Sequence, residues 1–140
     1  MKIFLDTNIL IDLLANRHPF TSEALKVFAL SEEGKIQLFT STHSIATTHY
    51  ILRKTVSESH LRHLLSELSE LVTVLDINQT IIKSSLKSAH KDFEYAIQIG
   101  CAESNGDIAY ILSRNLKDFK TSSIPSISVQ ELLSKIDLHL

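Results

Sequence analysis

The apolar positions of this chain alternate between short runs and longer segments in which they recur at helical spacing. Short runs typical of strands occupy residues 2–5, 36–41, 72–75 and 108–112. Helical spacing covers 9–14, 24–30, 42–54 and 57–71, a segment that opens near 78, about 92–104, and the segment after 128. Strands that alternate with helices indicate βαβ units, so the pattern predicts an α/β domain with a parallel sheet between helices.

Several helix boundaries carry their own signals. Asp92 is a good N-cap, and Ser128 with Glu131 three residues later matches a capping box. Pro19 interrupts the helical pattern because it lacks a backbone N–H. Gly34 ends the helix predicted at 24–30. In parallel sheets the ligand site lies at the carboxyl ends of the strands. Polar residues at those ends are therefore the candidates for function.

Composition limits the classes of protein that this chain can be. Its 140 residues are 44% apolar and 21% charged, which is typical of one compact domain, 1–140. The formal charge of −2 provides no general polycation, so RNA contact would need a local basic patch or a bridging metal ion. The single cysteine, Cys101, excludes an internal disulfide and fits a reducing compartment. No apolar run approaches the roughly 18 residues of a membrane span, and the N-terminal run is too short for a signal peptide. We therefore expect a cytoplasmic protein with no membrane segment.

Three polar clusters follow strand ends or open helices. The first is Asp6-Thr7-Asn8, the second contains Asp92 and Glu94, and the third runs from Ser113 to Phe119. Carboxylates held at a sheet edge suit a metal site. Helix capping and helix-dipole effects explain the first two equally simply, and a surface turn explains the third. Their convergence on one sheet edge is more informative than any single cluster.

Taken in order, these clusters resemble the PIN-domain family, in particular a bacterial subgroup that carries a DFED motif. The matching stretches are MKIFLDTNILIDLL at 1–14, FTSTHSIATTHYILRK at 39–54, KDFEYAIQIGCAESNGDIAYILSRNLKDFK at 91–120 and SIPSISVQELL at 123–133. They cover essentially the whole chain. The resemblance implies a three-layer α/β/α fold with a central parallel sheet.

The resemblance also implies an activity. PIN domains of this kind are metal-dependent nucleases in which three or four carboxylates bind Mg²⁺ or Mn²⁺ and cut single-stranded RNA. Many are VapC-type toxins that a small antitoxin protein neutralises, and such toxins usually dimerise through helices. The implied function is therefore that of an endoribonuclease, with RNA, an antitoxin and a second copy of the chain as partners.

Individual positions can be carried over from the family pattern. Asp6 matches the first metal-binding acid, and Asp118 matches the acid of the terminal DF element. Asn8 and Asn115 match accessory polar positions. Ser113 stands where threonine is usual and keeps the hydroxyl group.

Two acid positions of the family are substituted. Thr47 stands at the second and Tyr95 at the third, the last residue of DFED, and a neutral phenol is a poor substitute for a carboxylate ligand. At about 100° per residue, Asp92 lies roughly 60° around the helix from position 95 and Glu94 about 100°. Either could complete a three-acid catalytic and metal site. The alternative is a catalytically inactive PIN scaffold that binds RNA or a partner protein, so whether the chain is an enzyme stays open.

Other polar residues are less specific. Asp12 is expected on a helix surface, and His43 shares a helix face with Thr47, where it could contact phosphate. Several cations could ring one sheet edge or could be scattered solubilising charges: Lys35, Arg53, Lys54, Arg114, Lys117 and Lys120.

A set of leucines exceeds what a small core obviously requires, which would fit a homodimer built on helices. The leucines are Leu10, Leu13, Leu14, Leu61, Leu64 and Leu68.

Overall fold

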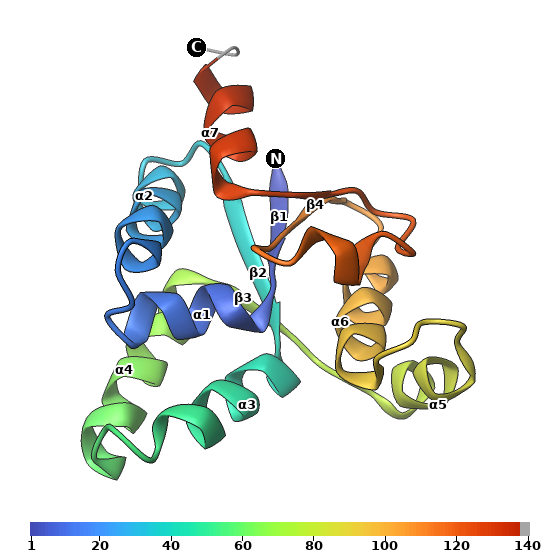
Figure 1. Cartoon of the computed structure of the whole chain (residues 1–140), viewed down its shortest axis with the longest axis horizontal. Helices are drawn as coiled ribbons and strands as arrows, with labels where there is room; N and C mark the ends of the chain where they lie inside the picture. The colour runs from blue at the N-terminus through green and yellow to red at the C-terminus, as the bar shows by residue number, and fades with distance from the viewer. Residues whose placement is uncertain (138–140) are drawn as a thin grey trace.

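A computed structural model describes residues 1–137 as a sheet flanked by helices (Figure 1). The strands are β1 (Lys2–Leu5), β2 (Gln37–Ser41), β3 (Thr73–Leu75), β4 (Ile108–Leu112) and β5 (Ser126–Ile127). The helices are α1 (Thr7–Leu14), α2 (Phe20–Glu32), α3 (Thr42–Leu52), α4 (Glu58–Leu71), α5 (Gln79–Lys87), α6 (Phe93–Ser104), the 3₁₀-helix η1 (Leu116–Phe119) and α7 (Val129–Asp137).

The sheet has five strands in the order β3-β2-β1-β4-β5, and every neighbouring pair is parallel. The chain leaves β1 toward one edge and later returns to pair β4 on the other side of β1. This reversal of strand order next to β1 is the place where parallel sheets form ligand crevices. The predicted α/β/α fold with a parallel sheet is confirmed.

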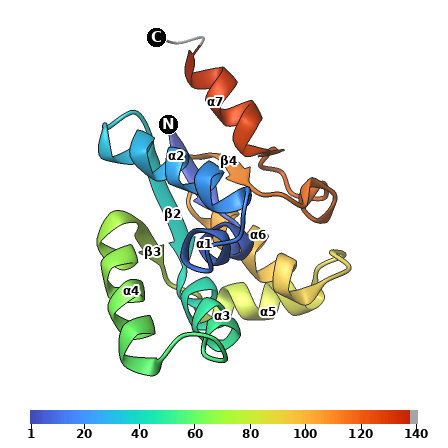
Figure 2. The same ribbon diagram turned by 60° about the vertical axis from the view of Figure 1, so that its left-hand side comes forward.

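Alternate residues of β1 supply two cores on opposite faces of the sheet. Ile3 and Leu5 join the larger core with residues of α1, α2, α4 and α7. Phe4 joins the smaller core with Ile99 of α6 and Phe119 of η1. Figures 1 and 2 show α1 to α4 gathered on one side of the sheet and α5 and α6 on the other. A strand that is buried on both faces has a continuous run of apolar residues, as β1 has at residues 3–5.

The predicted helix starts are formed by side-chain caps. Asn78 and Asp92 accept hydrogen bonds from the backbone N–H groups of Ile81 and Tyr95 at 2.9 and 3.2 Å. At the start of α7, Glu131 N–H donates to Ser128 Oγ at 3.2 Å, and Ser128 N–H donates to Glu131 Oε1 at 3.4 Å. These reciprocal bonds confirm the capping box.

The leucines that suggested a dimer belong largely to the core of the chain itself. Leu10 and Leu61 are fully buried, Leu68 is 2% exposed, and Leu13 and Leu14 pack against the same core. The inference that these leucines exceed the needs of the core is therefore wrong. Helices pack on both faces of the sheet, so the core takes up more apolar side chains than the pattern of any one helix indicates. The homodimer stays a prediction.

Among the described residues, no helix is long and apolar enough to cross a membrane.

Candidate active site

Asp6 lies at the carboxyl end of β1 and is 1% exposed. Its backbone N–H donates to the carbonyl oxygen of Leu112 at 3.0 Å, which continues the pairing of β1 with β4. Its Oδ2 accepts a hydrogen bond from Ser113 Oγ at 2.8 Å, whereas Oδ1 is buried and has no hydrogen-bond partner within residues 1–137. Burial raises the pKa of Asp6, and the polar groups around the carboxylate, first the Ser113 hydroxyl and then the Gln98 side chain and the backbone N–H groups of Asn8 and Thr7, offset only part of this effect. An unpartnered carboxylate oxygen of this kind is a position that a cation would stabilise.

Ser113 connects Asp6 to the segment that follows β4. Its hydroxyl is fully buried and accepts the backbone N–H of Asn115 at 2.9 Å while it donates to Asp6. The carbonyl oxygen of Asn115 accepts the N–H of Asp118 at 3.1 Å, which sets the first turn of η1. Asn115 and Asp118 are both exposed. The predicted cluster after β4 is thus tied to Asp6 by consecutive hydrogen bonds.

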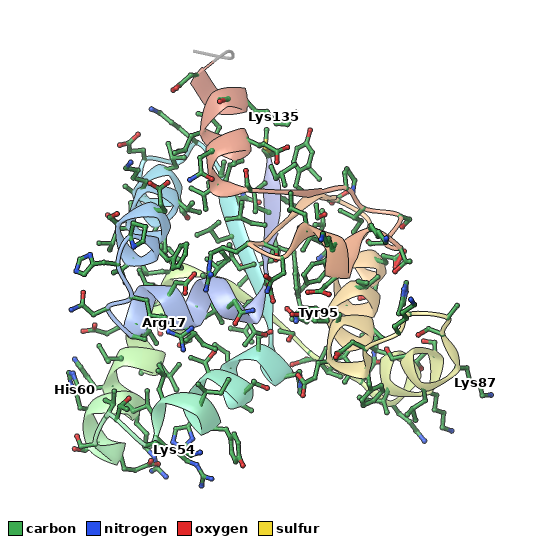
Figure 3. The ribbon with its side chains drawn as sticks, viewed as in Figure 1. Arg17, Lys54, His60, Lys87, Tyr95 and Lys135 are labelled. Atoms are coloured by element: carbon green, nitrogen blue, oxygen red, sulfur yellow. The ribbon has the colours of Figure 1, made fainter. Side chains whose placement is uncertain are left out.

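Tyr95 lies in the first turn of α6 and is half-buried (Figure 3). Its ring packs edge-on against Phe119, with centroids 5.0 Å apart and planes at 83°. Burial raises the pKa of Tyr95 to about 12, and the negative charges of Asp6 and Asp118 add to the effect. The Tyr95 phenol therefore lies within electrostatic range of both Asp6 and Asp118, and at neutral pH it stays protonated and uncharged.

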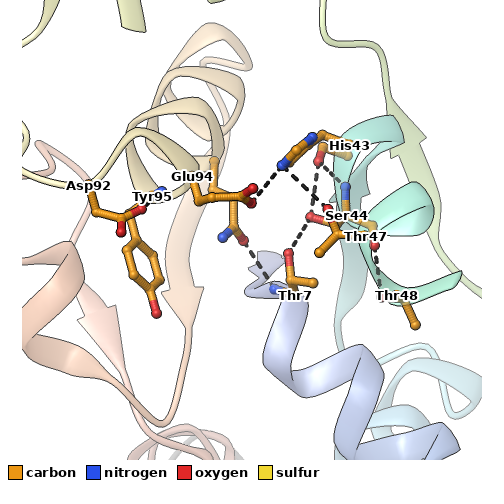
Figure 4. Close-up of polar contacts among 10 residues, drawn as sticks. Thr7, His43, Ser44, Thr47, Thr48, Asp92, Glu94 and Tyr95 are labelled. Carbon is orange, nitrogen blue, oxygen red and sulfur yellow. Dashed lines mark hydrogen bonds and ion pairs between the residues drawn. The ribbon is translucent and has the colours of Figure 1, made fainter. Parts of the chain in front are cut away.

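Asp92 and Glu94 make other contacts in this structure. The Asp92 carboxylate caps α6. Glu94 Oε2 lies 2.7 Å from Nε2 of His43 on α3, and the same nitrogen lies 3.4 Å from the hydroxyl oxygen of Thr47. Figure 4 shows Glu94 directed toward His43 and Tyr95 directed away from it. The prediction that either acid completes the site would require it to leave these partners.

The described residues contain no group of three or more His, Cys, Asp or Glu side chains placed to hold one metal ion. Asn8, in the first turn of α1, is half-buried next to Asp6 and Thr7. Asp6 and Asp118 are the two carboxylates whose charges raise the pKa of Tyr95.

A buried polar network that the sequence did not reveal fixes the helix ends around Asp6. Thr7 Oγ1 and Ser41 Oγ both donate to Ser44 Oγ, at 2.9 and 3.0 Å, and Thr7 N–H donates to Gln98 Oε1 at 3.1 Å (Figure 4). These bonds join α1 to α3 and α6 at Thr7, the residue that follows Asp6. The available sequence signal was Gln98, a polar residue among the apolar positions of α6.

Asp12 is buried, contrary to the expectation that it lies on a helix surface. It is 1% exposed and accepts a two-pronged hydrogen bond from Arg114, at 2.7 Å from Nε and 2.9 Å from Nη2. The guanidinium carbon of Arg114 lies 3.8 Å from the centroid of the Phe20 ring, and Arg17 approaches Asp12 at 3.9 Å. The sequence did not reveal this pair because its members are separated by most of the chain.

The cations that could ring one sheet edge or lie scattered over the surface are found in different surroundings. Arg114 is engaged by Asp12, Lys35 pairs with Glu33 at 2.9 Å, and Arg53 lies over the ring of Tyr50 at 4.3 Å. Lys117 and Lys120 instead line a pocket together with Asp118.

The chain matches known proteins over nearly its whole length. A family model described as PIN domain matches residues 2–117. Ribonuclease VapC1 of Aquifex aeolicus (strain VF5) is 23% identical in an alignment of 145 positions that covers 96% of this chain and 94% of the relative.

Solved structures with a similar fold include toxins and toxin–antitoxin complexes. VapBC-1 of nontypeable Haemophilus influenzae superposes with a TM-score of 0.69 at 21% identity, covering 93% of this chain and 99% of that one. A toxin-antitoxin complex of Klebsiella pneumoniae gives 0.62 at 27% identity over 85% and 91%. The Sarcin-Ricin loop cleaving toxin VapC20 of Mycobacterium tuberculosis gives 0.64 at 18% identity over 78% and 86%.

Proposed function

We propose that this chain, which belongs to the PIN domain family, is a metal-dependent endonuclease of single-stranded RNA of the VapC type. The observation that carries the proposal is Oδ1 of Asp6, which is buried without a hydrogen-bond partner among residues 1–137 at the point where the strand order reverses. The ribonuclease relative and the toxin structures support the same class of activity. Asp6 and Asp118 are the proposed catalytic and metal-binding acids.

The side chains at this edge fit a hard divalent cation such as Mg²⁺ or Mn²⁺. Asp6 offers an oxygen that has no hydrogen-bond partner in the described part of the chain. Asp118 is an exposed carboxylate, and its charge raises the pKa of Tyr95 as that of Asp6 does. Asp92 or Glu94 would add a third carboxylate after release from the cap or from His43. A bound ion would supply Lewis-acid stabilisation of the phosphate and a nucleophilic hydroxide.

The residues of the chain itself position these groups. Ser113 fixes the Asp6 carboxylate through Oδ2 and leaves Oδ1 free, and its bond to the Asn115 N–H orients the segment that carries Asp118. Asn8 and Asn115 supply neutral oxygen or N–H groups beside the acids. Tyr95 remains protonated, so it can donate a hydrogen bond to a phosphate oxygen but adds no negative charge.

The test is cleavage of a single-stranded RNA by the purified protein with Mn²⁺, compared with the nearly isosteric Asp6→Asn variant. Asp107→Asn is the matched control, because Asp107 is an exposed surface residue paired with Lys2. We expect cleavage by the wild type and the control, and background cleavage by Asp6→Asn. Equal cleavage by all three would assign the activity to a contaminant and defeat the proposal.

A second candidate function is a non-catalytic module that binds RNA or a partner protein. The phenol of Tyr95 beside Asp6 and Asp118 favours it, because this group replaces a negative ligand with a neutral one. Tyr95→Asp distinguishes the two functions. A strong gain of Mn²⁺-dependent cleavage would mean that tyrosine weakens the native site. RNA binding without cleavage in both proteins would favour the module.

The proposed partners are an antitoxin protein and a second copy of the chain. Antitoxin-containing complexes among the structural neighbours support the first. The homodimer has no support from the leucines that suggested it. Sedimentation that shows a monomer at high protein concentration would remove it.

A further inference from the structure

A small basic pocket lies between η1 and the segment that leads into α6. Its volume is about 170 Å³, and its lining includes His90, Lys91, Lys117 and Lys120 together with Tyr95 and Asp118. We call this set of six residues the basic pocket. Because Tyr95 and Asp118 line it, the pocket opens directly on the candidate active site.

The charge of the basic pocket differs from that of the whole chain. Lys91, Lys117 and Lys120 are all exposed, and within residues 1–137 none of them forms an ion pair. The three ammonium groups outnumber the two carboxylates beside them, Asp92 and Asp118, although the chain has a formal charge of −2. Positive charges held around one pocket repel each other, and an anion that binds in the pocket reduces this repulsion.

Hydrogen bonding holds the walls of the pocket in place. His90 Nδ1 and Thr121 Oγ1 are hydrogen-bonded at 2.6 Å, which joins the loop before α6 to the segment after η1. The edge-on contact of Tyr95 with Phe119 joins α6 to η1, the elements next to these two segments. The lysines therefore project from segments that are tied to each other rather than from independent loops.

We propose that the basic pocket binds the phosphate backbone of the RNA strand on the Asp118 side of the bond that is cut. This inference rests on the proposed function. Ammonium groups suit phosphate as compact charges with rotatable donors, and they read no base, so the site would position the strand without selecting its sequence. The shared residues Tyr95 and Asp118 make a strand in the pocket continuous with the phosphate at the acids.

The experiment measures RNA binding in an Asp6→Asn background, so that the strand stays intact. A labelled single-stranded RNA is titrated by fluorescence anisotropy over a series of salt concentrations. The test variant carries Lys91→Ala, Lys117→Ala and Lys120→Ala. The control carries Lys26→Ala, Lys54→Ala and Lys83→Ala, which remove the same total charge from other exposed positions.

We expect the dependence of log K on log salt to flatten by about 2 in the test variant, because each phosphate of a single strand that a lysine neutralises contributes about 0.7 to the slope. The control should keep the wild-type slope. Equal slopes in the two triple variants would overturn the assignment of the pocket. Lysine-dependent binding of poly-glutamate as tight as that of RNA would also overturn it, in favour of an acidic protein segment.

The outcomes separate this inference from the function on which it rests. RNA binding with the expected change of slope, but no Mn²⁺-dependent cleavage by the wild type, would defeat the nuclease proposal and leave the RNA site. Cleavage with equal slopes would defeat the site and leave the nuclease. Absence of RNA binding by every variant would defeat the site, while the cleavage assay alone decides the nuclease proposal.

Discussion

Replacing Asp6 with asparagine should stabilise the metal-free protein at neutral pH, because it removes a buried charge and keeps the shape of the side chain. An ionised carboxylate that is 1% exposed carries an effective desolvation cost of several kcal/mol. Against this gain, the hydrogen bond from Ser113 loses its charged acceptor, which costs about 1 kcal/mol. The new amide group would also occupy the unpartnered position of Oδ1, at about 1–3 kcal/mol. The two losses together come to about 2–4 kcal/mol, so a desolvation cost of about 4–5 kcal/mol leaves a net gain of roughly 1–2 kcal/mol for asparagine.

The pH dependence of this gain follows from the direction of the pKa shift. The folded-state pKa of Asp6 lies above the ordinary value of 3.8, so the folded protein holds this proton more tightly than the unfolded chain. The wild type therefore loses stability as pH rises from the ordinary value through the raised one, and then levels off. The advantage of Asp6→Asn should be absent below pH 3.8 and complete above the raised pKa.

Thermal denaturation followed by circular dichroism, with a chelator present, measures the effect across this pH range. A gain of 1–2 kcal/mol corresponds to an increase in Tm of roughly 3–8 °C for a chain of this size. Added Mn²⁺ should raise the Tm of the wild type and leave that of Asp6→Asn unchanged. A variant that is less stable than the wild type at every pH, with an unaltered spectrum, would refute the reasoning about Oδ1.

Three further substitutions test other parts of the structure. Phe119→Ala should lower the free energy of unfolding, measured by urea denaturation, by about 3–5 kcal/mol because Phe119 is 1% exposed. The control Phe93→Ala should lower it far less because Phe93 is 44% exposed, and equal losses would contradict the assigned packing. Arg114→Ala leaves the carboxylate of Asp12 buried without its main partner and should cost about 3–5 kcal/mol. Adding Asp12→Asn should recover part of that loss in a double-mutant cycle, and full additivity would show that the pair is not coupled. Ser41→Ala removes the N-cap of α3 and should cost about 1 kcal/mol, so an unchanged Tm would mean that the cap contributes nothing.

The strands and most helices could be predicted because their signals are local. The run at 2–5 is apolar on both faces, and Asp92 and Ser128 cap the helices that the pattern indicated. β5 was missed because its two residues are too few to show a period. Its formation depends on pairing with β4 at Ile111 and Leu112, which is a tertiary contact.

In the candidate site, too, some features could be predicted from local signals and others depend on tertiary contacts. The rule for strand ends correctly brought Asp6 and Ser113 together, because β1 and β4 are neighbours in the sheet. The direction of Glu94 could not be predicted, because it depends on the position of His43, a residue on another helix. Angular separation on a helix gives the angle at which a side chain leaves the axis. It does not give the partner that the side chain meets.

The hydrogen bonding of Ser113 determines where Asp6 can carry a proton. The hydroxyl of Ser113 has one hydrogen, and because its oxygen already accepts the N–H of Asn115, that hydrogen is directed to Oδ2 of Asp6. Oδ2 is thereby kept as an acceptor, and an added proton goes to Oδ1, the buried atom that has no hydrogen-bond partner among residues 1–137. Proton and metal ion would therefore compete for a single oxygen atom. Below the raised pKa of Asp6, each tenfold fall in proton concentration should make about ten times more of this oxygen accessible to the ion.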